Sequence, residues 1–403
     1  MKKVLIIAYH FPPINDSGTF RTLGYVKYLR EFGWNPSVLT CKDSMSFLKD
    51  EHLLEEIPPE VKIERAPHIF FPWGIRAITN RIPDGYIGWL PFAYFKALNM
   101  MKEEDYNIIY STSPTPTTHL ISYLLKKKTG KPWITDFRDE WTQNPFFKYS
   151  SFYKNINQWL EKKVLQHADA VISVSEGITE GLQTLINNDE NKFHTITNGY
   201  NASDFINYNP KDTYGDKFKI TYTGGFSGGY PSGLNYPYHF FKIIGKLLKE
   251  NKIDNNDLRI VKVGYKEELD PEIPKENICY VGCVPHNEVF RHVENTTILL
   301  LVVQTERGKG AYTGKIFEYI NSKKPILALV PQDGVAADLI RKTNTGIIVD
   351  PNNIEGIKKA ILYFYNQWKN NTLKIKPNWE IIKQYERKNL TKKLAQIFDE
   401  LVR

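Results

Sequence analysis

The stretch that decides the fold spans residues 297–330 and reads TILLLVVQTERGKGAYTGKIFEYINSKKPILALV. Its apolar runs at 297–303 and 325–330 predict two buried strands, because strands covered on both faces of a parallel sheet carry continuous apolar residues. Between the runs lie a loop that contains three glycines and a segment with the apolar period of a helix. This order of strand, glycine loop, helix and strand is typical of ligand-binding α/β folds.

The glycine loop and the start of this helix suit an anionic, hydroxylated ligand. Glycines let backbone N–H groups approach a phosphate closely, and a helix N-terminus adds a favourable dipole. Lys315 adds a full positive charge, while Glu318 can accept hydrogen bonds from a ribose diol. The alternative is an ordinary surface helix that is capped by Thr313 and leaves Glu318 solvated.

The rest of the chain repeats the same alternation. A length of 403 residues allows two or three domains. Apolar runs alternate with helix-like segments on both sides of an Asn-, Gly- and Asp-rich stretch, which predicts an α/β protein of two Rossmann-like, doubly wound parallel-sheet domains facing an interdomain cleft. The expected parts are an N-terminal domain over 1–203, a linker over 204–216, a C-terminal domain over 217–378, and a helix over 379–403 that could pack on either domain.

The composition favours an anionic partner and a reducing compartment. A net charge of +8 suits phosphates, nucleic acid or an acidic lipid surface without choosing among them. Three cysteines argue against a disulfide framework, and no second pair accompanies Cys279 and Cys283 to suggest zinc. The first apolar run meets Phe-Pro-Pro rather than a cleavage site, and no run reaches the ~18–20 residues that span a bilayer, so we expect a cytoplasmic location.

Two loops in the first half place charged residues where predicted strands end, which is where open α/β sheets bind ligands. Gly18 opens a helix and Arg21 lies about one turn inside it, so this helix start predicts a second anion site. The alternative is a capped helix with Arg21 on a solvated face. Asp136, Arg138 and Asp139 follow a buried strand and predict contacts with sugar hydroxyls and phosphate, unless they form a structural Arg–Asp pair.

A glycine-rich loop over 223–233 follows a predicted strand of the second half. It matches neither Gly-x-Gly-x-x-Gly nor a P-loop, because other residues occupy the required glycine and lysine positions. Its backbone amides can still cradle a diphosphate, and Ser227 can add a hydroxyl. A flexible connection without a ligand is the alternative.

With these motifs in place, the chain resembles the GT-B glycosyltransferases, specifically the retaining glycosyltransferase family 4 type (glycosyl transferases group 1). The resemblance covers nearly the whole chain in order. The motifs that carry it are Tyr9-His-Phe-Pro-Pro with Ser17-Gly18, Asp136-Phe-Arg-Asp-Glu-Trp141, Asp169-Ala-Val-Ile-Ser-Val-Ser175 with Thr197-Asn-Gly-Tyr-Asn201, and Thr313-Gly-Lys-Ile-Phe-Glu-Tyr-Ile320 followed by Pro325-Ile-Leu.

The resemblance implies that the domain over 1–203 is the acceptor-side domain and that the domain over 217–378 binds the nucleotide-sugar. It also implies a role for each motif. Glu318 would bind the donor ribose, and Lys315 would face the diphosphate and the transferred sugar. The candidate catalytic residues are Arg138, Asp139 and Lys315. The candidate donor-binding residues are Gly18, Arg21, Gly225, Phe226 and Ser227 along the phosphates or closing over the donor, Cys283 and Val284 beside the base, and Arg307, Gly310, Tyr312, Thr313, Gly314, Lys315 and Glu318 in the loop and helix of the opening stretch.

The chain departs from the family pattern in three places. The family has two glutamates with seven residues between them, but the position of the first is Gly310 here. The Arg and Lys that usually follow the first strand of the second domain are missing, so we expect Lys315, Arg307 or Lys309 to supply that charge. Arg138 stands where the mid-domain motif often has histidine. These departures leave the identity of the donor sugar open.

The resemblance implies a retaining, metal-independent hexosyltransferase. It would move a sugar from a nucleotide-diphosphate sugar, with a UDP-sugar favoured, to a glycan or lipid-linked acceptor in surface polysaccharide biosynthesis. We expect neither a cofactor nor a metal, and the sequence has no Asp-x-Asp motif. The alternatives are a GT-B sugar-nucleotide epimerase and a non-catalytic nucleotide-sugar or polyanion-binding protein. Nucleic acid is not an expected partner, because its recognition motifs are absent from the sequence.

Two segments, 67–82 and 86–98, combine aromatic residues with Arg and Lys. This composition is typical of a contact with a membrane interface. The hypothesis is that 67–98 docks peripherally to an anionic membrane, at the inner face of the plasma membrane, near a lipid-linked acceptor. The alternative is a packed insertion in the N-terminal domain.

Overall fold

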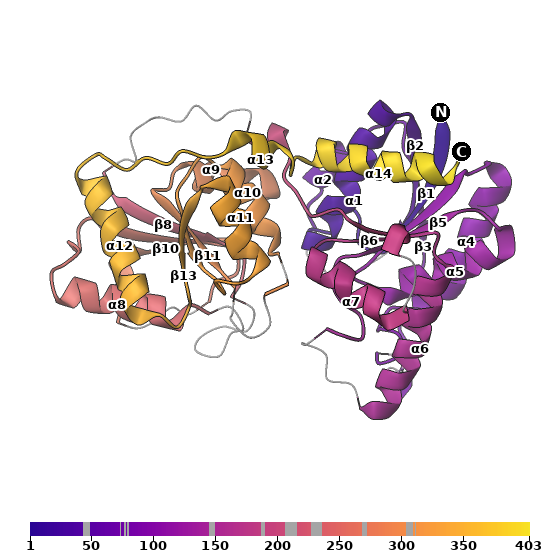
Figure 1. Cartoon of the computed structure of the whole chain (residues 1–403), viewed down its shortest axis with the longest axis horizontal. Coiled ribbons are helices and arrows are strands. Elements are labelled where there is room, and N and C mark those ends of the chain that lie inside the picture. Colours follow the sequence, from indigo (N-terminus) through magenta and orange to yellow (C-terminus); the bar gives the residue numbers. More distant parts are fainter. Residues whose placement is uncertain are drawn as a thin grey trace. The chain divides into compact units, whose positions relative to one another are not determined.

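The chain divides into two compact units. The computed structural model describes residues 1–42, 49–72, 74–75, 78, 80–144, 150–186, 190–205, 216–226, 236–267, 272–303, 309–310 and 312–403. Unit 1 comprises 1–198 with 387–403, and unit 2 comprises 199–386 (Figure 1). Most of the predicted linker, 206–215, lies outside the described residues.

Unit 1 is built on a parallel seven-stranded sheet in the order β3-β2-β1-β4-β5-β6-β7. The apolar runs of the first half form its strands, as predicted. The short edge strand β7 was not predicted, because three residues give no usable period. The strands are β1 (Lys2–Ala8), β2 (Trp34–Cys41), β3 (Lys62–Ala66), β4 (Ile108–Thr112), β5 (Trp133–Phe137), β6 (Ala170–Ser173) and β7 (Phe193–Thr195).

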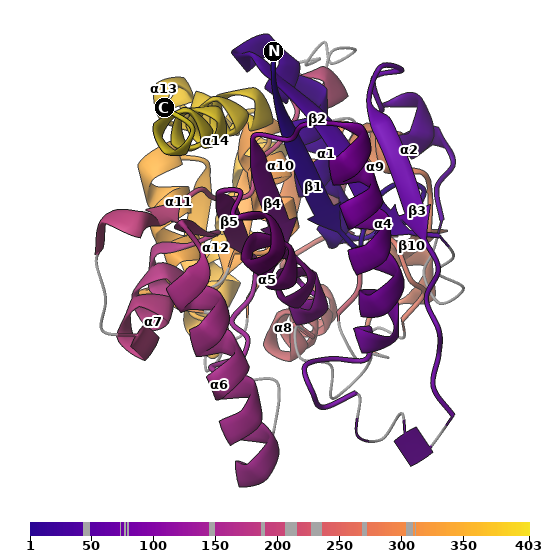
Figure 2. The ribbon, with the colours of Figure 1, turned by 90° about the vertical axis from the view of Figure 1, so that its right-hand side faces the viewer.

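Helices cover both faces of this sheet, so alternate residues of a strand enter different cores (Figure 2). Leu5 and Ile7 of β1 pack on one side, while Val4 and Ile6 pack on the other. The first side is covered by α4 (Leu90–Glu103), α5 (Pro116–Thr129), α6 (Ser151–His167) and α7 (Glu176–Ile186), and the second by α1 (Ser17–Tyr28) and α14 (Arg387–Leu401).

Unit 2 repeats the plan with a parallel six-stranded sheet in the order β10-β9-β8-β11-β12-β13. Its strands are β8 (Phe218–Thr223), β9 (Leu258–Val263), β10 (Ile278–Gly282), β11 (Ile298–Val302), β12 (Ile326–Leu329) and β13 (Gly346–Val349). Helices α8 (Tyr238–Lys249) and α12 (Ile354–Lys369) cover one face, and α9 (His286–Glu294), α10 (Gly314–Asn321), α11 (Val335–Thr343) and α13 (Trp379–Lys383) contribute to the core on the other.

The strand orders confirm the predicted doubly wound sheets. Each sheet grows outward in both directions from its first strand, so the strand order reverses between the neighbours β1 and β4 and between the neighbours β8 and β11. The crevice at the carboxyl ends of such a pair is where open α/β sheets bind ligands. The stretch at 297–330 forms β11, α10 and β12, so its loop opens at this point of unit 2.

The C-terminal segment departs from the single helix expected over 379–403. It forms two helices, α13 in unit 2 and α14 in unit 1. Ile382 enters a core of unit 2, while Leu394 and Phe398 enter a core of unit 1, where the Phe398 ring lies 5.0 Å from that of Trp34. The apolar residues of this one period therefore pack into two different cores, and the helix is interrupted between them.

Candidate active site

The helix start at Gly18 is already occupied by a carboxylate of the chain. Asp16 is the N-cap of α1, and its Oδ1 accepts hydrogen bonds from the backbone N–H groups of Gly18 at 2.7 Å and Thr19 at 3.1 Å. His10 pairs through Nδ1 with the other oxygen of Asp16. Burial opposes ionisation, yet the hydrogen bond from His10 lowers the pKa of Asp16. The N-terminus of α1 thus binds an internal anion, in line with the capped-helix alternative.

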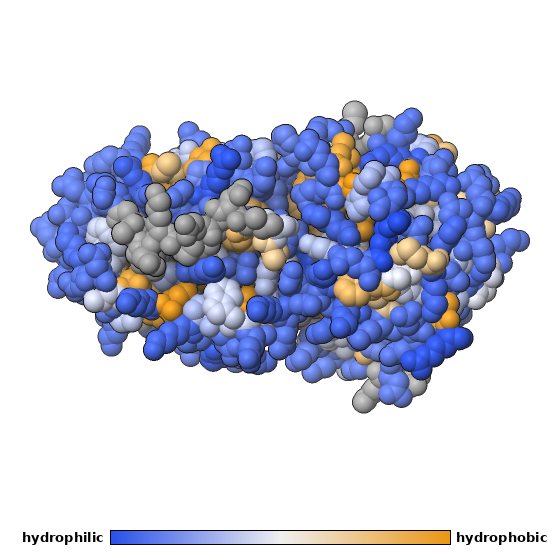
Figure 3. Space-filling model, turned by 90° about the horizontal axis from the view of Figure 1, so that it is seen from above, coloured by the Kyte–Doolittle hydropathy of each residue, from blue (hydrophilic) through white to orange (hydrophobic). Residues whose placement is uncertain are grey.

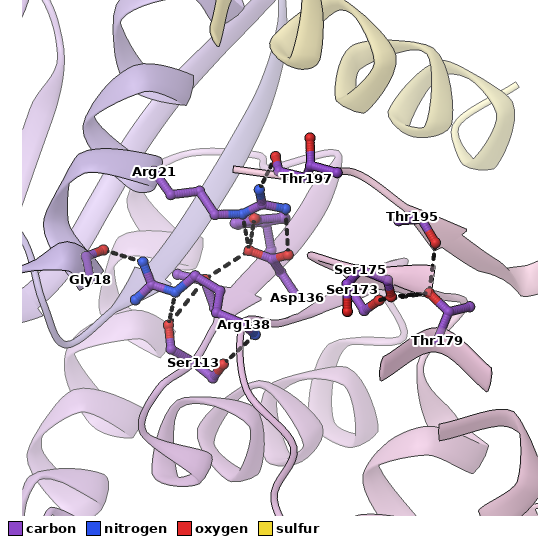
Figure 4. A network of polar contacts seen from close by, with 12 residues as sticks. Gly18, Arg21, Ser113, Asp136, Arg138, Ser173, Ser175, Thr179, Thr195 and Thr197 are labelled. Carbon is purple, nitrogen blue, oxygen red and sulfur yellow. Dashed lines mark hydrogen bonds and ion pairs between the residues drawn. The ribbon is translucent and has the colours of Figure 1, made fainter. Parts of the chain in front are cut away.

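Arg21 forms a buried ion pair instead of facing solvent (Figure 4). Its Nε and Nη2 donate to the two oxygens of Asp136 at 2.9 and 2.8 Å, and Nη1 donates to the carbonyl of Thr197 at 2.7 Å. Tyr110 and Thr112 also donate to Asp136, at 2.6 and 2.9 Å. All three guanidinium nitrogens are engaged, so the prediction of Arg21 as a donor ligand is corrected to a structural role. Burial opposes ionisation of Asp136, but Arg21 lowers its pKa.

Arg138 is also buried, and it fastens the Gly18 loop to the end of β4 (Figure 4). Its Nε donates to the carbonyl of Ser113 at 2.5 Å, and its Nη1 donates to the carbonyl of Gly18. Burial lowers the pKa of Arg138, and the nearby Arg21 adds to that effect. Asp139 is exposed. Burial around the Asp139 carboxyl nevertheless raises its pKa, so exposure of the residue as a whole does not extend fully to this group. Of the two candidate catalytic residues of unit 1, Arg138 supports the loop.

Gly18 allows this close approach because it has no side chain. A Cβ at this position would lie 2.7 Å from Oδ1 of Asp16 and 2.9 Å from Nη2 of Arg138. We expect Gly18→Ala to destabilise unit 1 by about 1–3 kcal/mol, since the crowded atoms belong to a fixed network. Gly310→Ala is the matched control, because a Cβ there has open space among the described residues. Denaturant unfolding of both variants tests this. If Gly18→Ala and Gly310→Ala had the same free energy of unfolding, the side chains around Gly18 would be able to move aside without cost.

The loop after β8 divides the predicted phosphate-binding residues. Gly224 has φ +89°, a left-handed conformation that favours glycine, and the Gly225 carbonyl accepts from Tyr222 at 3.0 Å. The Phe226 ring is fully buried and stacks on the Tyr222 ring at 4.4 Å between centroids. Its backbone N–H donates to both oxygens of Glu267, each at 2.9 Å. The prediction of Phe226 as a donor contact is therefore corrected: the residue belongs to the core.

Within the part of the chain that the structure describes, the start of α10 is open, in contrast to that of α1. Its N-cap Thr313 makes no side-chain capping bond, and among the described residues the Thr313 hydroxyl has no hydrogen-bond partner. A Cβ on Gly314 would meet open space within that part of the chain. Tyr312, just before the cap, packs its ring 5.3 Å from Phe317. The first N–H groups of α10 can accordingly receive an anion.

Lys315 lies in the first turn of α10 and reaches back to β8. Its Nζ donates to the Thr223 carbonyl and lies 3.8 Å from the centroid of the Tyr222 ring. Burial, followed by repulsion from Lys262, lowers the pKa of Lys315 to about 7. A desolvated ammonium that gains an anionic partner recovers this cost, so Lys315 is suited to a diphosphate.

Glu318 lies one turn further along α10 and is paired with a histidine. Its Oε1 lies 3.2 Å from Nε2 of His286, the first residue of α9, and both side chains are largely buried. The sequence analysis did not identify His286, although it follows Val284 by only two residues. Cys283 is exposed and Val284 is half-buried. This pair brings α10 to the loop after β10, which was predicted to contact the base.

The carboxyl edge of the unit 2 sheet therefore gathers most of the predicted donor-binding residues. Those that the structure describes there are Gly225, Cys283, Val284, Gly310, Tyr312, Thr313, Gly314, Lys315 and Glu318. Ser227 and Arg307 lie outside the described residues. Two groups at this edge were missed, His286 and Lys262, the latter a lysine on β9 whose side chain is 1% exposed.

Comparisons with known proteins agree with this architecture. Residues 21–204 match the family model of Glycosyltransferase Family 4. Sucrose-phosphate synthase from Thermosynechococcus elongatus is similar at 13% identity and a TM-score of 0.64, covering 100% of this chain and 99% of that chain. A glycosyltransferase from Rickettsia africae has 16% identity, a TM-score of 0.65 and the same coverage. HepE from Anabaena, solved in complex with UDP, has 12% identity, a TM-score of 0.65, and coverage of 99% and 100%. Among curated protein sequences, none matches at a significant level.

The two doubly wound units and these structural likenesses define a GT-B protein. The match of residues 21–204 to the model of glycosyltransferase family 4 agrees with the resemblance that the motifs indicated. At these identities the solved structures show the fold alone, so donor, acceptor and stereochemistry must be argued from the site.

Proposed function

We propose that this protein is a retaining hexosyltransferase that moves a sugar from a UDP-sugar to a glycan or lipid-linked acceptor in surface polysaccharide biosynthesis. The observation that carries the proposal is the open N-terminus of α10, with Lys315 in its first turn and Glu318 one turn later. An uncapped helix start with a lysine fits a diphosphate, and a carboxylate beyond it fits a ribose. HepE, which shares the fold, was solved with UDP, and this supports uracil as the base.

In this proposal the protein stabilises the leaving group and positions the two substrates. The N–H groups of α10 and Lys315 neutralise the charge that develops on the diphosphate as the sugar leaves. The departing phosphate oxygen takes the proton of the acceptor hydroxyl, which approaches the same face of the sugar. In unit 1, Asp139 is the candidate carboxylate that would orient acceptor hydroxyls. The reaction needs neither a metal nor a cofactor, because these cationic groups serve the diphosphate directly.

A thermal-shift screen against UDP-, GDP-, dTDP- and CMP-sugars tests the donor assignment. We expect one or more UDP-sugars to raise the midpoint of unfolding, because a ligand that binds only the folded state stabilises it. A response to none of the four nucleotide classes would contradict the proposal. Incubating the best UDP-sugar without acceptor and analysing the recovered sugar addresses the chemistry. We expect an unchanged sugar; an inverted centre would identify an epimerase instead.

We also propose that unit 1 contacts an anionic membrane peripherally, near a lipid-linked acceptor. Within the described residues, no helix is both long and apolar enough to cross a bilayer. Figure 3 shows a mostly hydrophilic face with small hydrophobic groups. Segment 69–81 nevertheless exposes Ile69, Phe70, Ile75 and Ile78 at 48–55% each. The adjoining α6 exposes Phe152 and Trp159, and Arg81 joins the two segments by lying 5.2 Å from the Tyr153 ring.

Part of the predicted membrane segment is packed. Ala93 and Ala97 of α4 are fully buried in the core, in line with the packed-insertion alternative for 86–98. Phe95 of the same helix is 65% exposed, so docking involves the exposed apolar side chains of 69–81, α4 and α6. Co-flotation with anionic liposomes tests it, with Trp159→Ser as the variant and Tyr363→Ser as the control. Tyr363 is an aromatic residue of unit 2 that is 51% exposed, against 60% for Trp159. Wild-type protein that remains in the soluble fraction would rule the contact out.

A further inference from the structure

A second lysine lies behind the candidate diphosphate site of unit 2. Lys262 is on β9, the neighbour of β8, and only 1% of its side chain is exposed. Its ammonium donates to the carbonyls of Gly224 and Tyr265 and lies 3.1 Å from Glu267. These partners can engage all three of its protons, so Lys262 has no donor left for a ligand.

Lys262 and Lys315 hold adjacent carbonyls of one strand end. Lys315 donates to Thr223 and Lys262 donates to Gly224. Both ammonium groups also lie near the same aromatic ring, at 3.8 and 5.5 Å from the Tyr222 centroid. Two ammonium groups so close together repel each other in a site with little water.

We propose that Lys262 is a positioning residue of the donor site: it fixes the loop after β8 through Gly224 and Glu267, and its charge makes Lys315 take up a proton when the donor diphosphate binds. This inference rests on the proposed function of the site. The proton comes from solution and binds to Nζ of Lys315. The ammonium then exchanges its hydrogen bond to Thr223 for one to a phosphate oxygen, and no covalent bond to carbon or phosphorus changes.

The groups around Lys315 favour this linkage. β9 contributes Lys262, and the loop after it contributes Glu267, which is already held by Lys262 and by a backbone N–H of the loop after β8. Helix α10 itself contributes Glu318, which is paired with His286 of α9, and the phenol of Tyr319, which bonds to Thr223. The phenol of Tyr222, on β8, has its pKa raised by burial and is neutral. Among the described groups, the two carboxylates that raise the pKa of Lys315, Glu318 and Glu267, are thus both held by other groups as well.

The titration behaviour agrees with the geometry. Burial is the main reason that the pKa of Lys315 falls to about 7, and Lys262 lowers it further, whereas Glu318 and Glu267 raise it. Free protein above pH 7 therefore holds a largely neutral Lys315. The charged form binds a diphosphate, so affinity should be highest at low pH and fall as the pH rises above 7. It should stop falling at the higher pKa that Lys315 has in the complex.

Calorimetric titration with UDP between pH 6.5 and 9, in buffers of different ionisation enthalpy, measures affinity and proton uptake together. The wild type should take up more than half a proton at pH 8. Lys262→Met should weaken UDP binding about tenfold, because it removes a charged hydrogen bond that holds the loop after β8. It should also shift the fall in affinity to higher pH, because it removes a charge that lowers the pKa of Lys315. Lys262→Arg keeps the charge and should keep the proton uptake. Ionisation of UDP itself is common to all variants and cancels in the comparison.

Glu267→Gln should shift the pH at which UDP affinity falls in the direction opposite to Lys262→Met. It therefore distinguishes an effect of charge on Lys315 from a general loss of structure in the loop. Removing this carboxylate lowers the pKa of Lys315, and the fall in affinity should move to lower pH. Lys252→Met, an exposed lysine of the same unit, should change neither quantity. Wild-type affinity and proton uptake in both Lys262→Met and Glu267→Gln would overturn the inference. Should Lys262→Met not fold, Lys262→Arg and Glu267→Gln decide alone. A wild type that binds no UDP would instead contradict the proposed function.

Discussion

We expect Glu318→Ala to lower kcat/KM for a UDP-sugar roughly 100-fold or more. Two hydrogen bonds from a ribose diol to a carboxylate contribute about 1.5–3 kcal/mol each, and every 1.4 kcal/mol is a factor of ten. The side chain is 16% exposed, so it is largely shielded from water yet still reachable. Steady-state kinetics and calorimetry with UDP provide the measurement. UDP alone should lose a similar factor in affinity, because the ribose belongs to the nucleotide.

Two further variants define what the Glu318 result means. Glu318→Gln keeps the shape of the side chain but accepts hydrogen bonds more weakly. Its kcat/KM and UDP affinity should therefore lie between those of the wild type and Glu318→Ala. Glu355→Ala removes an exposed carboxylate of α12 in the same unit and should leave both quantities unchanged. Thermal unfolding shows whether losing the contact with His286 disturbs the fold. A Glu318→Ala protein that folds normally and binds UDP like the wild type would exclude the ribose role.

The second large effect concerns stability. We expect Arg21→Met to destabilise unit 1 by about 3–5 kcal/mol, because it leaves the carboxylate of Asp136 buried without its counter-charge. Asp136 is fully buried, and both of its oxygens face Arg21. Denaturant unfolding of the whole chain, followed through tryptophan fluorescence, gives the change in the free energy of unfolding.

A surface ion pair serves as the matched control. Arg30 lies 3.1 Å from Glu60, with side chains 34% and 45% exposed, and Arg30→Met should cost at most about 1 kcal/mol. If Arg21→Met proved as stable as Arg30→Met and instead lost affinity for UDP, the donor-binding role first predicted for Arg21 would return. We expect UDP affinity to persist in the fraction that remains folded.

Much of the fold could be predicted because both sheets are parallel and covered on both faces. Their strands are continuous apolar runs, and runs such as 298–302 have no other plausible place in a soluble domain. The fate of the C-terminal segment could not be predicted, since one apolar period is compatible with either core. The helix break between Lys383 and Arg387 follows from which unit each half packs against.

The candidate site could be located from the sequence where the residue type carries the chemistry, and residues were missed where tertiary partners decide. Lys315 and Glu318 stand at fixed distances from a glycine loop, so the roles proposed for them follow from local spacing. Arg21 looked equally available, but its partner Asp136 is 115 residues away in sequence. Lys262 lies within a predicted strand, where a single lysine usually marks a solvated position. His286 had no motif to mark it, and only its contact with Glu318 makes it relevant.

A crystal structure of the protein with UDP tests the central claim most directly. The account predicts the diphosphate at the N-terminus of α10 within hydrogen-bond distance of Lys315, and the ribose hydroxyls on the carboxylate of Glu318. The uracil should lie beside Cys283 and Val284. A nucleotide bound only in unit 1, or one in unit 2 whose ribose is remote from Glu318, would contradict it.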